Sequence, residues 1–479
     1  MQQIVIMKFG ESCFQTATTF HKILKILQKY QSYKQIAVVS ALPDIIELLR
    51  DCARKANTCT SYDHDINLIR RRHLELVDSL LEEPYKTKVK QFLSDKFTQL
   101  QEILEDIEEY GLSDNKLDIV LSFGEILSGY ILNQFLLSNN IESEYILGDK
   151  FLITDSRYNN ALPIMNMAVR KVRTLFTPLL QLGHLPICTG FIGRNKEGHL
   201  TTLGAGGTEF TAALIAYCLK DEEHATRVIF WKNTDGILNC DPQIVPSTQT
   251  IKQLSYEEAK EIAIGTKVLH PKCIGHLQNR EIPLEIRNAN NLASTNFTLI
   301  QKESIYQDKI IGITYRDEVA MVSAISESTV EIPGVLAQIF NIMGQNEINI
   351  SMVSQTSSEI STMFVVNASD GNDAKEFLMG SEFFKDWFEI RVEYVSMISL
   401  IGGGVNNPRN LQKIFTALAK HNIKILALSQ ANDGLNITLL VQKADLIKGI
   451  QALHKELSLI HISEPTRPLY ISYAVFCLK

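Results

Sequence analysis

The chain has 479 residues, of which 45% are hydrophobic and 21% charged, an ordinary globular composition that is long enough for about two to four domains. The formal net charge of -7 argues against a nucleic-acid partner, because phosphate contacts need clustered lysine and arginine, and no run approaches the length of a membrane span. Eight sparse cysteines without metal-binding spacing exclude a disulfide scaffold and a cysteine metal site, so a cytoplasmic protein with reduced thiols is expected.

The first part of the chain predicts an α/β fold. Apolar, β-branched runs at residues 4–9 and 36–41 flank a helical pattern at residues 18–30, which indicates a βαβ unit with a parallel sheet. Charged, helix-favouring sequence from about residue 62 to 112 predicts a helical excursion with solvent-exposed acidic faces. Further strand-like runs extend the pattern to residue 300, at residues 117–123, 185–193, 227–233 and 282–288.

After a polar linker at residues 301–312, the sequence repeats itself. Residues 333–366 align without a gap to residues 408–441, in a shared order of helix, strand, polar turn and strand. The repeat predicts two paired ferredoxin-like βαββαβ units, at residues 313–390 and 391–456.

The last segment, residues 457–479, differs in composition from what precedes it. Two prolines and an aromatic, apolar end follow a finished amphipathic helix, and in one reading frame the segment resembles translated adapter DNA. We expect a non-native tail here; the alternative is a genuine C-terminal strand.

Two glycine-bearing turns are candidate phosphate sites. Lys8-Phe9-Gly10-Glu11-Ser12 ends the first strand, and Leu203-Gly204-Ala205-Gly206-Gly207-Thr208-Glu209 opens a helical run. Backbone N–H groups at such turns hold phosphates, so two of them in one α/β domain favour a nucleotide. Neither turn meets GxGxxG and no GxxxxGK[ST] occurs, which excludes the Rossmann fingerprint and the P-loop.

An ordered set of segments resembles the aspartate kinases, within the wider amino-acid kinase group. The segments are KFGES, VVSA, SFGEILS, GFIG followed by TTLGAGGTEFTAA, WKNTDGILNCDP, SYEEA, GTKVLHP and RNANN. The resemblance covers residues 1 to about 456, and the repeat resembles the paired ACT regulatory domains of that family. It implies a three-layer αβα kinase domain with a mainly parallel sheet at residues 1–300, followed by two ferredoxin-like ACT domains.

The activity that the resemblance implies is ATP-dependent phosphorylation of the β-carboxylate of L-aspartate to 4-phospho-L-aspartate. This reaction begins the synthesis of lysine, threonine and methionine, and Mg²⁺ would enter with ATP. The paired ACT domains imply feedback by an amino-acid effector, lysine or threonine, and a homodimer.

The resemblance also implies roles for individual residues. Catalytic roles fall to Lys8, Glu209 and Lys267. ATP binding falls to Lys8, Gly10, Ser12, Asn233, Asp235, Gly236 and Lys267. Substrate binding falls to Ser40, Glu125, Gly206, Gly207, Thr208 and Arg194. Effector binding falls to Pro333, Gly334, Val335, Ser354, Gln355 and Ser357.

Several positions depart from the family pattern, and they cluster on the chemistry. The arginine that would clamp the substrate α-carboxylate is Ala205, and the neighbouring aspartate is Glu209. The other departures are Glu11 for glycine, Ile46 for threonine and Asn233 for aspartate.

Three interpretations follow from these departures. An active kinase would need Arg194 or Lys232 to supply the missing positive charge. A degenerate kinase homologue would keep the fold as an amino-acid-sensing regulatory protein. The chain would also suit the N-terminal part of a truncated bifunctional aspartokinase/homoserine dehydrogenase.

Overall fold

The computed structural model describes residues 3–221, 226–265, 268–306, 308–326, 333–355, 361–457 and 459. The chain divides into two compact units, Met1–Leu238 with Thr250–Ser304, and Asn239–Gln249 with Ile305–Lys479. Lys267, Ser357 and nearly all of the predicted tail lie outside the described residues.

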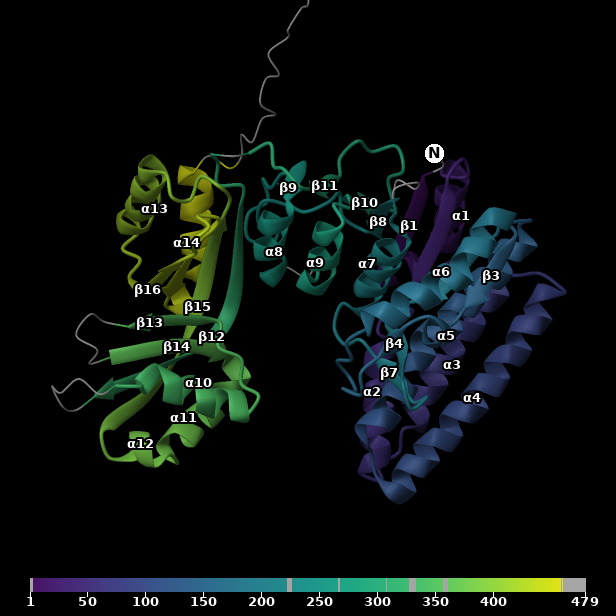
Figure 1. Cartoon of the computed structure of the whole chain (residues 1–479), viewed down its shortest axis with the longest axis horizontal. Helices are drawn as coiled ribbons and strands as arrows, with labels where there is room; N and C mark the ends of the chain where they lie inside the picture. Colours follow the sequence, from purple (N-terminus) through teal and green to yellow (C-terminus); the bar gives the residue numbers. More distant parts are fainter. Residues whose placement is uncertain are drawn as a thin grey trace, which may run out of the picture. The chain divides into compact units, whose positions relative to one another are not determined.

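The first unit is built on an eight-stranded sheet in the order β3-β5-β2-β1-β8-β10-β11-β9 (Figure 1). Its strands are β1 Ile4–Phe9, β2 Lys34–Val39, β3 Ser143–Ile146, β5 Leu185–Thr189, β8 Thr226–Lys232, β9 Gln253–Ser255, β10 Leu284–Asn288 and β11 Thr298–Gln301. Neighbouring strands are parallel except the antiparallel pair β10–β11, so the predicted mainly parallel sheet is confirmed. A small sheet joins β4 Ile153–Thr154, β6 Ile192–Asn195 and β7 Leu200–Thr202.

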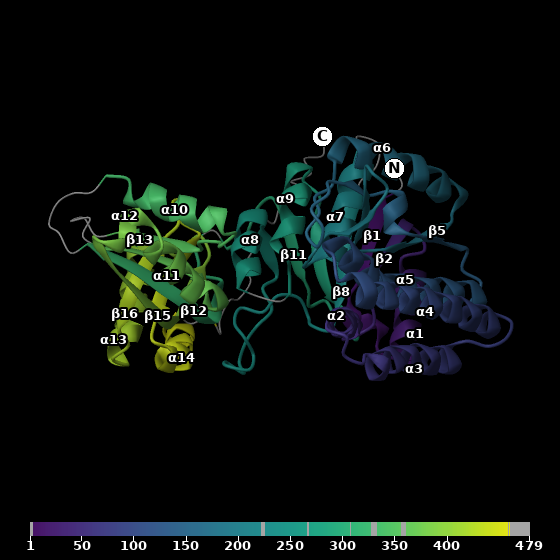
Figure 2. The same ribbon diagram turned by 90° about the horizontal axis from the view of Figure 1, so that it is seen from below.

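The helices of this unit connect its strands. They are α1 Ala17–Lys29, α2 Ile45–Asn57, α3 Asp63–Leu80, α4 Tyr85–Tyr110, α5 Asp114–Ser138, α6 Met165–Leu182, α7 Gly207–Leu219, α8 Tyr256–Ile264 and α9 Pro271–Asn279. Four consecutive helices, α2 to α5, lie between β2 and β3. Short 3₁₀ turns occur at η1 Glu11–Phe14 and η2 Gly148–Lys150. Helices α1, α3, α4 and α5 lie together on one side of the unit (Figure 2).

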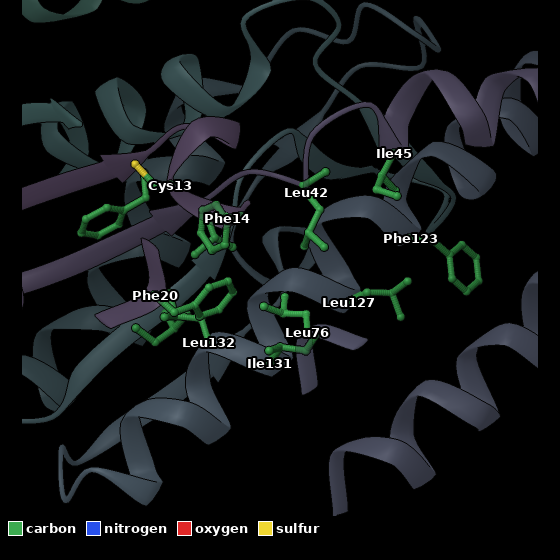
Figure 3. Packing of buried hydrophobic residues seen from close by; sticks show 14 of the residues in the cluster. Cys13, Phe14, Phe20, Leu42, Ile45, Leu76, Phe123, Leu127, Ile131 and Leu132 are labelled. Atoms are coloured by element: carbon green, nitrogen blue, oxygen red, sulfur yellow. The ribbon is translucent and has the colours of Figure 1, made fainter. Parts of the chain in front are cut away.

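The two faces of the parallel sheet bury different side chains. On β1, Val5, Met7 and Phe9 belong to a large core that also contains residues of α1, α2 and α5. Figure 3 shows Phe14 and Phe20 packed beside Leu132 of α5 in this core. The alternate residue of β1, Lys8, pairs with a side chain of α7, so α7 covers the opposite face. Helices on both faces give the predicted αβα layers.

The strand predicted at residues 117–123 is wrong. These residues lie in the first half of α5, which begins after Ser113. The Ser113 side chain accepts a hydrogen bond from the Lys116 N–H. Helix α5 is almost fully buried, so its apolar residues fall on all sides and hide the helical period in the sequence. The helix is long and apolar enough to cross a membrane by composition, but 89% of its most apolar window is buried inside the structure, as in a core helix.

The second unit contains one six-stranded sheet in the order β13-β14-β12-β15-β17-β16. Its strands are β12 Gly312–Ser326, β13 Met352–Gln355, β14 Ser361–Asn367, β15 Phe388–Ile401, β16 Ile425–Gln430 and β17 Asn436–Val441. Its helices are α10 Val335–Gln345, α11 Gly371–Met379, α12 Glu382–Lys385, α13 Pro408–Lys420 and α14 Leu446–Glu456, with 3₁₀ turns at η3 Ala368–Asp370 and η4 Lys443–Asp445. Both repeats therefore show the predicted ferredoxin-like elements.

The two repeats share their central strands. The second half of β12, from Val319, pairs with β14 and the first half of β15, whereas the first half of β12 pairs with the second half of β15. The second half of β15 in turn pairs with β17. Residues 312–316, at the start of the predicted first unit, thus complete the sheet of the second one.

A short segment from the predicted kinase domain, residues 1–300, belongs to this second unit. Cys240 and Val245 are buried in the same core as Ile398 and Leu400 of β15. The Tyr315 hydroxyl lies 2.8 Å from a carboxylate oxygen of Asp241 and donates a hydrogen bond to it. Residues 239–249 therefore fold with the strands that follow them by some seventy positions along the chain.

Candidate active site

A cavity of about 1170 Å³ lies at the carboxyl ends of β1, β2 and β8 in the first unit. Parallel strands bring these ends to one edge of the sheet, which is the usual ligand position in open α/β folds. Ten of the residues predicted for the site line it: Lys8, Gly10, Ser12, Ser40, Glu125, Gly206, Gly207, Thr208, Glu209 and Asn233.

The centre of the cavity wall carries one carboxylate between two ammonium groups. Oε1 of Glu209 lies 2.7 Å from Nζ of Lys232 and 3.5 Å from Nζ of Lys8. The other oxygen, Oε2, accepts a hydrogen bond of 2.9 Å from the backbone N–H of His270. Burial alone would raise the pKa of Glu209, but the two lysines outweigh it and hold the pKa below its usual value. Glu209 is therefore ionised at neutral pH.

Strand register places the two lysines together. Lys8 of β1 is the register partner of Phe230 on β8, and Lys232 follows Phe230 by two residues. Because side chains alternate between the faces of a strand, Lys8 and Lys232 leave the sheet on the same face. That face is covered by α7, whose first turn carries Glu209.

Glu125 of α5 is a second buried carboxyl group in the cavity wall. Its side chain is only 4% exposed, and Oε2 has no hydrogen-bond partner within the described structure. Burial raises the pKa of Glu125 to about 8, although hydrogen bonds from the Ala41 backbone and the Thr208 side chain oppose the shift. The Ser128 hydroxyl, one turn further along α5, donates to the carbonyl of Ser40 at 2.7 Å. Glu125 thus presents a carboxyl oxygen that a ligand ammonium group would satisfy.

The glycine turns are shaped for close approach. Gly206 has φ +70°, and a Cβ at this position would lie 2.3 Å from the His270 ring. Helix α7 begins at the next residue, and its first turn, Gly207 to Glu209, lines the cavity. The Gly207 N–H donates to the Gly204 carbonyl at 2.9 Å, and the helix N-terminus favours an anion nearby. At the other turn, a Cβ on Gly10 would lie 3.2 Å from Nζ of Lys8. Glycine at these turns therefore makes room for two side chains of the cavity wall, His270 and Lys8, while the Gly10 N–H donates to the Trp231 carbonyl at 3.1 Å.

Three of the residues predicted for the site do not line the cavity. Arg194 pairs with the buried carboxylate of Asp149, and it is not among the residues that line the cavity. Asp235 accepts a hydrogen bond of 2.8 Å from the Asn288 amide. Gly236 has φ +97° and packs against Thr298, where a Cβ would lie 2.5 Å from the hydroxyl. Asp235 and Gly236 fix the loop after β8 instead of lining the cavity, and the structure gives Lys232, not Arg194, as the additional cation beside Lys8.

The departures from the aspartate kinase pattern gather at this cavity. Glu11, Ile46, Ala205, Glu209 and Asn233 all line it. Ile46 packs so closely to α5 that a Cβ on Gly124 would lie 2.6 Å from its terminal carbon. The substitutions therefore change the walls of one site and leave the fold intact.

Sequence reasoning missed several residues of the cavity wall. His270 caps α9 and orients Glu209 through its N–H, and Arg50 lies on α2 one turn after Ile46. Ile46 and Arg50 are four residues apart, so they lie on the same face of the helix. Since Ile46 is predicted to lie in the site, this spacing could have predicted that Arg50 lines the cavity as well. Asp44, before the first turn of α2, has φ +61° and also lines the cavity.

The predicted effector residues lie in the second unit. Gly334 has φ +89° and precedes α10, Val335 is buried, and Pro333 is in the turn before them. Ser354 and Gln355 end the edge strand β13. Within the described ranges of either unit, no group of three His, Cys, Asp or Glu side chains is arranged to hold a metal ion.

Comparisons with known proteins agree on the family. The profile of the amino acid kinase family matches residues 3–288, and that of the ACT domain matches residues 322–380 and 398–457. A bifunctional aspartokinase/homoserine dehydrogenase of Buchnera aphidicola is 27% identical over 94% of this chain and 56% of its own length. Aspartokinase 1 of Arabidopsis thaliana, a chloroplast protein, is 25% identical over 94% of this chain and 79% of its own length.

Solved structures show the same fold. Aspartokinase III of E. coli, in complex with aspartate and ADP, has a TM-score of 0.80 at 22% identity and covers 95% of this chain and 100% of its own. The aspartate kinase of Clostridium acetobutylicum has a TM-score of 0.73 at 22% identity, with the same coverage. The chain spans about half the length of the bifunctional relatives it matches. Since the first profile covers more than half of the sequence, the chain belongs to the amino acid kinase family.

Proposed function

We propose that the chain is an aspartate kinase, which phosphorylates the β-carboxylate of L-aspartate with ATP and is regulated through its ACT repeats by an amino acid. The observation that carries the proposal is the cavity in which Lys8, Lys232 and Glu209 face the glycine turns while Glu125 keeps an unpaired oxygen. The cationic side suits phosphates, and the buried carboxyl suits the ammonium group of an amino acid.

The reaction requires mainly that the protein position the two substrates and stabilise the negative charge on the transferred phosphoryl group. A β-carboxylate oxygen of aspartate attacks the γ-phosphorus, the bond from that phosphorus to the bridging oxygen breaks, and ADP leaves with the bonding electrons. Lys8 and the N–H groups at the start of α7 would hold the phosphate oxygens, and Glu125 would hold the aspartate ammonium group.

The cavity also suits Mg²⁺ that enters with ATP. Magnesium is typically held by phosphates, water and one or two carboxylates, so the lack of a preformed cluster among the described residues is compatible with it. Glu209, which is ionised, and Asn233 are the oxygen-bearing side chains that would hold the ion. When bound, the ion would neutralise negative charge on the phosphate oxygens.

Regulation and assembly are part of the proposal. The E. coli aspartokinase III has also been solved with lysine and aspartate, with a TM-score of 0.75 to this chain at 22% identity. We propose lysine or threonine as the effector, bound near Gly334 and Ser354, in a homodimer paired through the ACT repeats in the cytoplasm. Addition of each amino acid to the assay below, with the oligomeric state measured by light scattering, tests these points.

The central test is aspartate-dependent ADP release by the full chain, with hydroxylamine trapping of the acyl phosphate as the hydroxamate. Trapped product that requires both ATP and aspartate supports the proposal. Binding of ATP without product, in a folded protein that still binds an amino acid, would instead favour a regulatory homologue. The Glu11 side chain on the rim of the cavity, at a turn suited to phosphate, is the observation behind that second candidate.

A further inference from the structure

We propose that Lys232 is a second phosphate-binding cation, which together with Lys8 holds the terminal phosphoryl group of the nucleotide. This inference deepens the proposed function and rests on it. The segment WKNTDG of this chain, residues 231–236, corresponds to WTDVDG in the aspartate kinase pattern. That pattern has a threonine at the position of Lys232, so the proposed role of Lys232 does not come from the family pattern.

The first argument is the geometry of the two ammonium groups. Both lie within 3.5 Å of the same oxygen, Oε1 of Glu209, so one tetrahedral phosphoryl group is large enough to contact both. Each ammonium group carries three N–H donors, and Glu209 is the carboxylate paired with Lys8 and Lys232 in the described part of the chain. Donors therefore remain on both lysines, and both side chains line the cavity.

The second argument is charge. The side chains of Lys8, Lys232 and Glu209 are 9%, 15% and 8% exposed. These three side chains together carry one net positive charge in a poorly hydrated wall, which is costly unless an anion compensates it. Glu11 also lines the cavity, and a bound phosphoryl group would compete with its carboxylate for the two lysines.

The third argument concerns the position of Lys232 within the cavity. It lies two residues beyond the register partner of Lys8 on the adjacent strand, on the face that α7 covers. The first turn of α7, whose helix N-terminus favours an anion, lines the same cavity. Glu125, the candidate for the amino group, projects from a different helix, α5. Lys232 thus lies beside Lys8 at the carboxyl edge of the sheet, in contact with the first turn of α7 through Glu209.

The test compares nucleotides that differ by the terminal phosphate. Calorimetric titration of the full chain with Mg–AMP-PNP and with Mg–ADP gives the contribution of the terminal phosphoryl group. In Lys232→Met, we expect the affinity for AMP-PNP to fall about 10- to 100-fold, which is the usual contribution of a charge-assisted hydrogen bond. The affinity for ADP should change by less than about threefold. Lys232→Arg, which retains the charge, should recover most of the AMP-PNP affinity.

The control is Arg194→Gln, which removes a cation of the same unit that pairs with Asp149 away from the cavity. It should leave the ratio of the two affinities unchanged. Thermal melting of each variant shows that it is folded, and Lys232→Arg remains informative if Lys232→Met is not.

Equal affinities of Lys232→Met and the parent chain for AMP-PNP, or equal losses for AMP-PNP and ADP, would overturn the inference. Because these titrations need no turnover, their result is separate from that of the aspartate assay. A parent chain that binds AMP-PNP through Lys232 but releases no ADP with aspartate would contradict the proposed reaction alone.

Discussion

At the scale of the residue, Glu125 links pH to stability. Its pKa in the folded chain is about 8, above the ordinary value of 4.5, so between these values the folded state binds more protons than the unfolded state. Stability is therefore lost as pH rises through this window. We expect Glu125→Gln to gain at least about 1 kcal/mol relative to the parent chain between pH 6 and pH 8.5, since full titration gives about 1.4 kcal/mol per pH unit. Urea unfolding of both proteins at the two pH values checks this, and a constant difference would contradict it.

A second single residue, Ala205, bears on the acceptor end of the cavity. Ala205 lines the cavity between Gly204 and Gly206, where the aspartate kinase pattern has an arginine. A guanidinium group there would pair with a carboxylate of the substrate, and hydrogen bonds to charged groups are worth about 1.5–3 kcal/mol. We expect Ala205→Arg to lower the KM for aspartate by more than tenfold in the ADP-release assay. Ala205→Gln, of similar reach without charge, is the control, and an equal effect of both variants would argue against a carboxylate clamp.

At the scale of the element, Asp118 joins α5 to the cavity wall. It is fully buried, and its carboxylate accepts hydrogen bonds from the backbone N–H groups of Asn159 and Thr202 and from the Thr202 hydroxyl. Asn159 and Thr202 both line the cavity. Asp118→Ala should lower the free energy of unfolding by about 3 kcal/mol, because it leaves several buried donors without an acceptor. Asp114→Ala, on the exposed start of the same helix, should cost less than about 1 kcal/mol, and similar losses in denaturant unfolding would refute the special role of Asp118.

The elements also show where sequence reasoning succeeds and fails. The apolar, β-branched runs of the interior strands β1 and β2 and the period of three to four in the amphipathic helix α1 are clear, and all three elements form where the sequence predicts them. Residues 117–123 fail because α5 is buried on every side, which removes the polar face that would reveal a helix. In the site, the motifs identify Lys8, Glu125 and Glu209, but the choice between Arg194 and Lys232 depends on strand register and on the Asp149 pair, which are three-dimensional facts.

At the scale of the whole molecule, the sequence order and the folding units do not coincide. The repeat in the sequence indicates two separate copies, yet β12 and β15 run through both of them in one sheet. Likewise, residues 239–249 lie within the kinase half of the sequence but pack into the core formed by β15 and α13. The loop that follows Lys232 and Asn233 of the cavity wall therefore continues directly into the ACT-containing unit. The cavity and the ACT-containing unit are thus linked by a few residues of chain.

This arrangement predicts that the kinase domain, expressed without the ACT repeats, leaves residues 239–249 without the core that buries them. A fragment of residues 1–304 retains Cys240 but lacks β12, β15 and the rest of the core that buries it. In the full chain Cys240 is 4% exposed and burial raises its pKa to about 11, both of which slow the reaction of its thiol with an alkylating reagent. We expect Cys240 to be labelled by iodoacetamide at least about tenfold faster in the fragment than in the full chain, as measured by peptide mass spectrometry.

Two other cysteines serve as internal controls in the same samples. Cys59 is exposed and should be labelled quickly in both proteins, whereas Cys188, which is fully buried in β5, should stay protected in both if the fragment retains its sheet. Protection of Cys240 in a fragment that also protects Cys188 would mean that residues 239–249 find a core within the kinase half. Fast labelling of Cys240 alone would show that residues 239–249 need the ACT-containing strands for their structure. Because this segment follows Lys232 and Asn233 by a few residues along the chain, a change in those strands would then act on a segment that is directly bonded to the cavity wall.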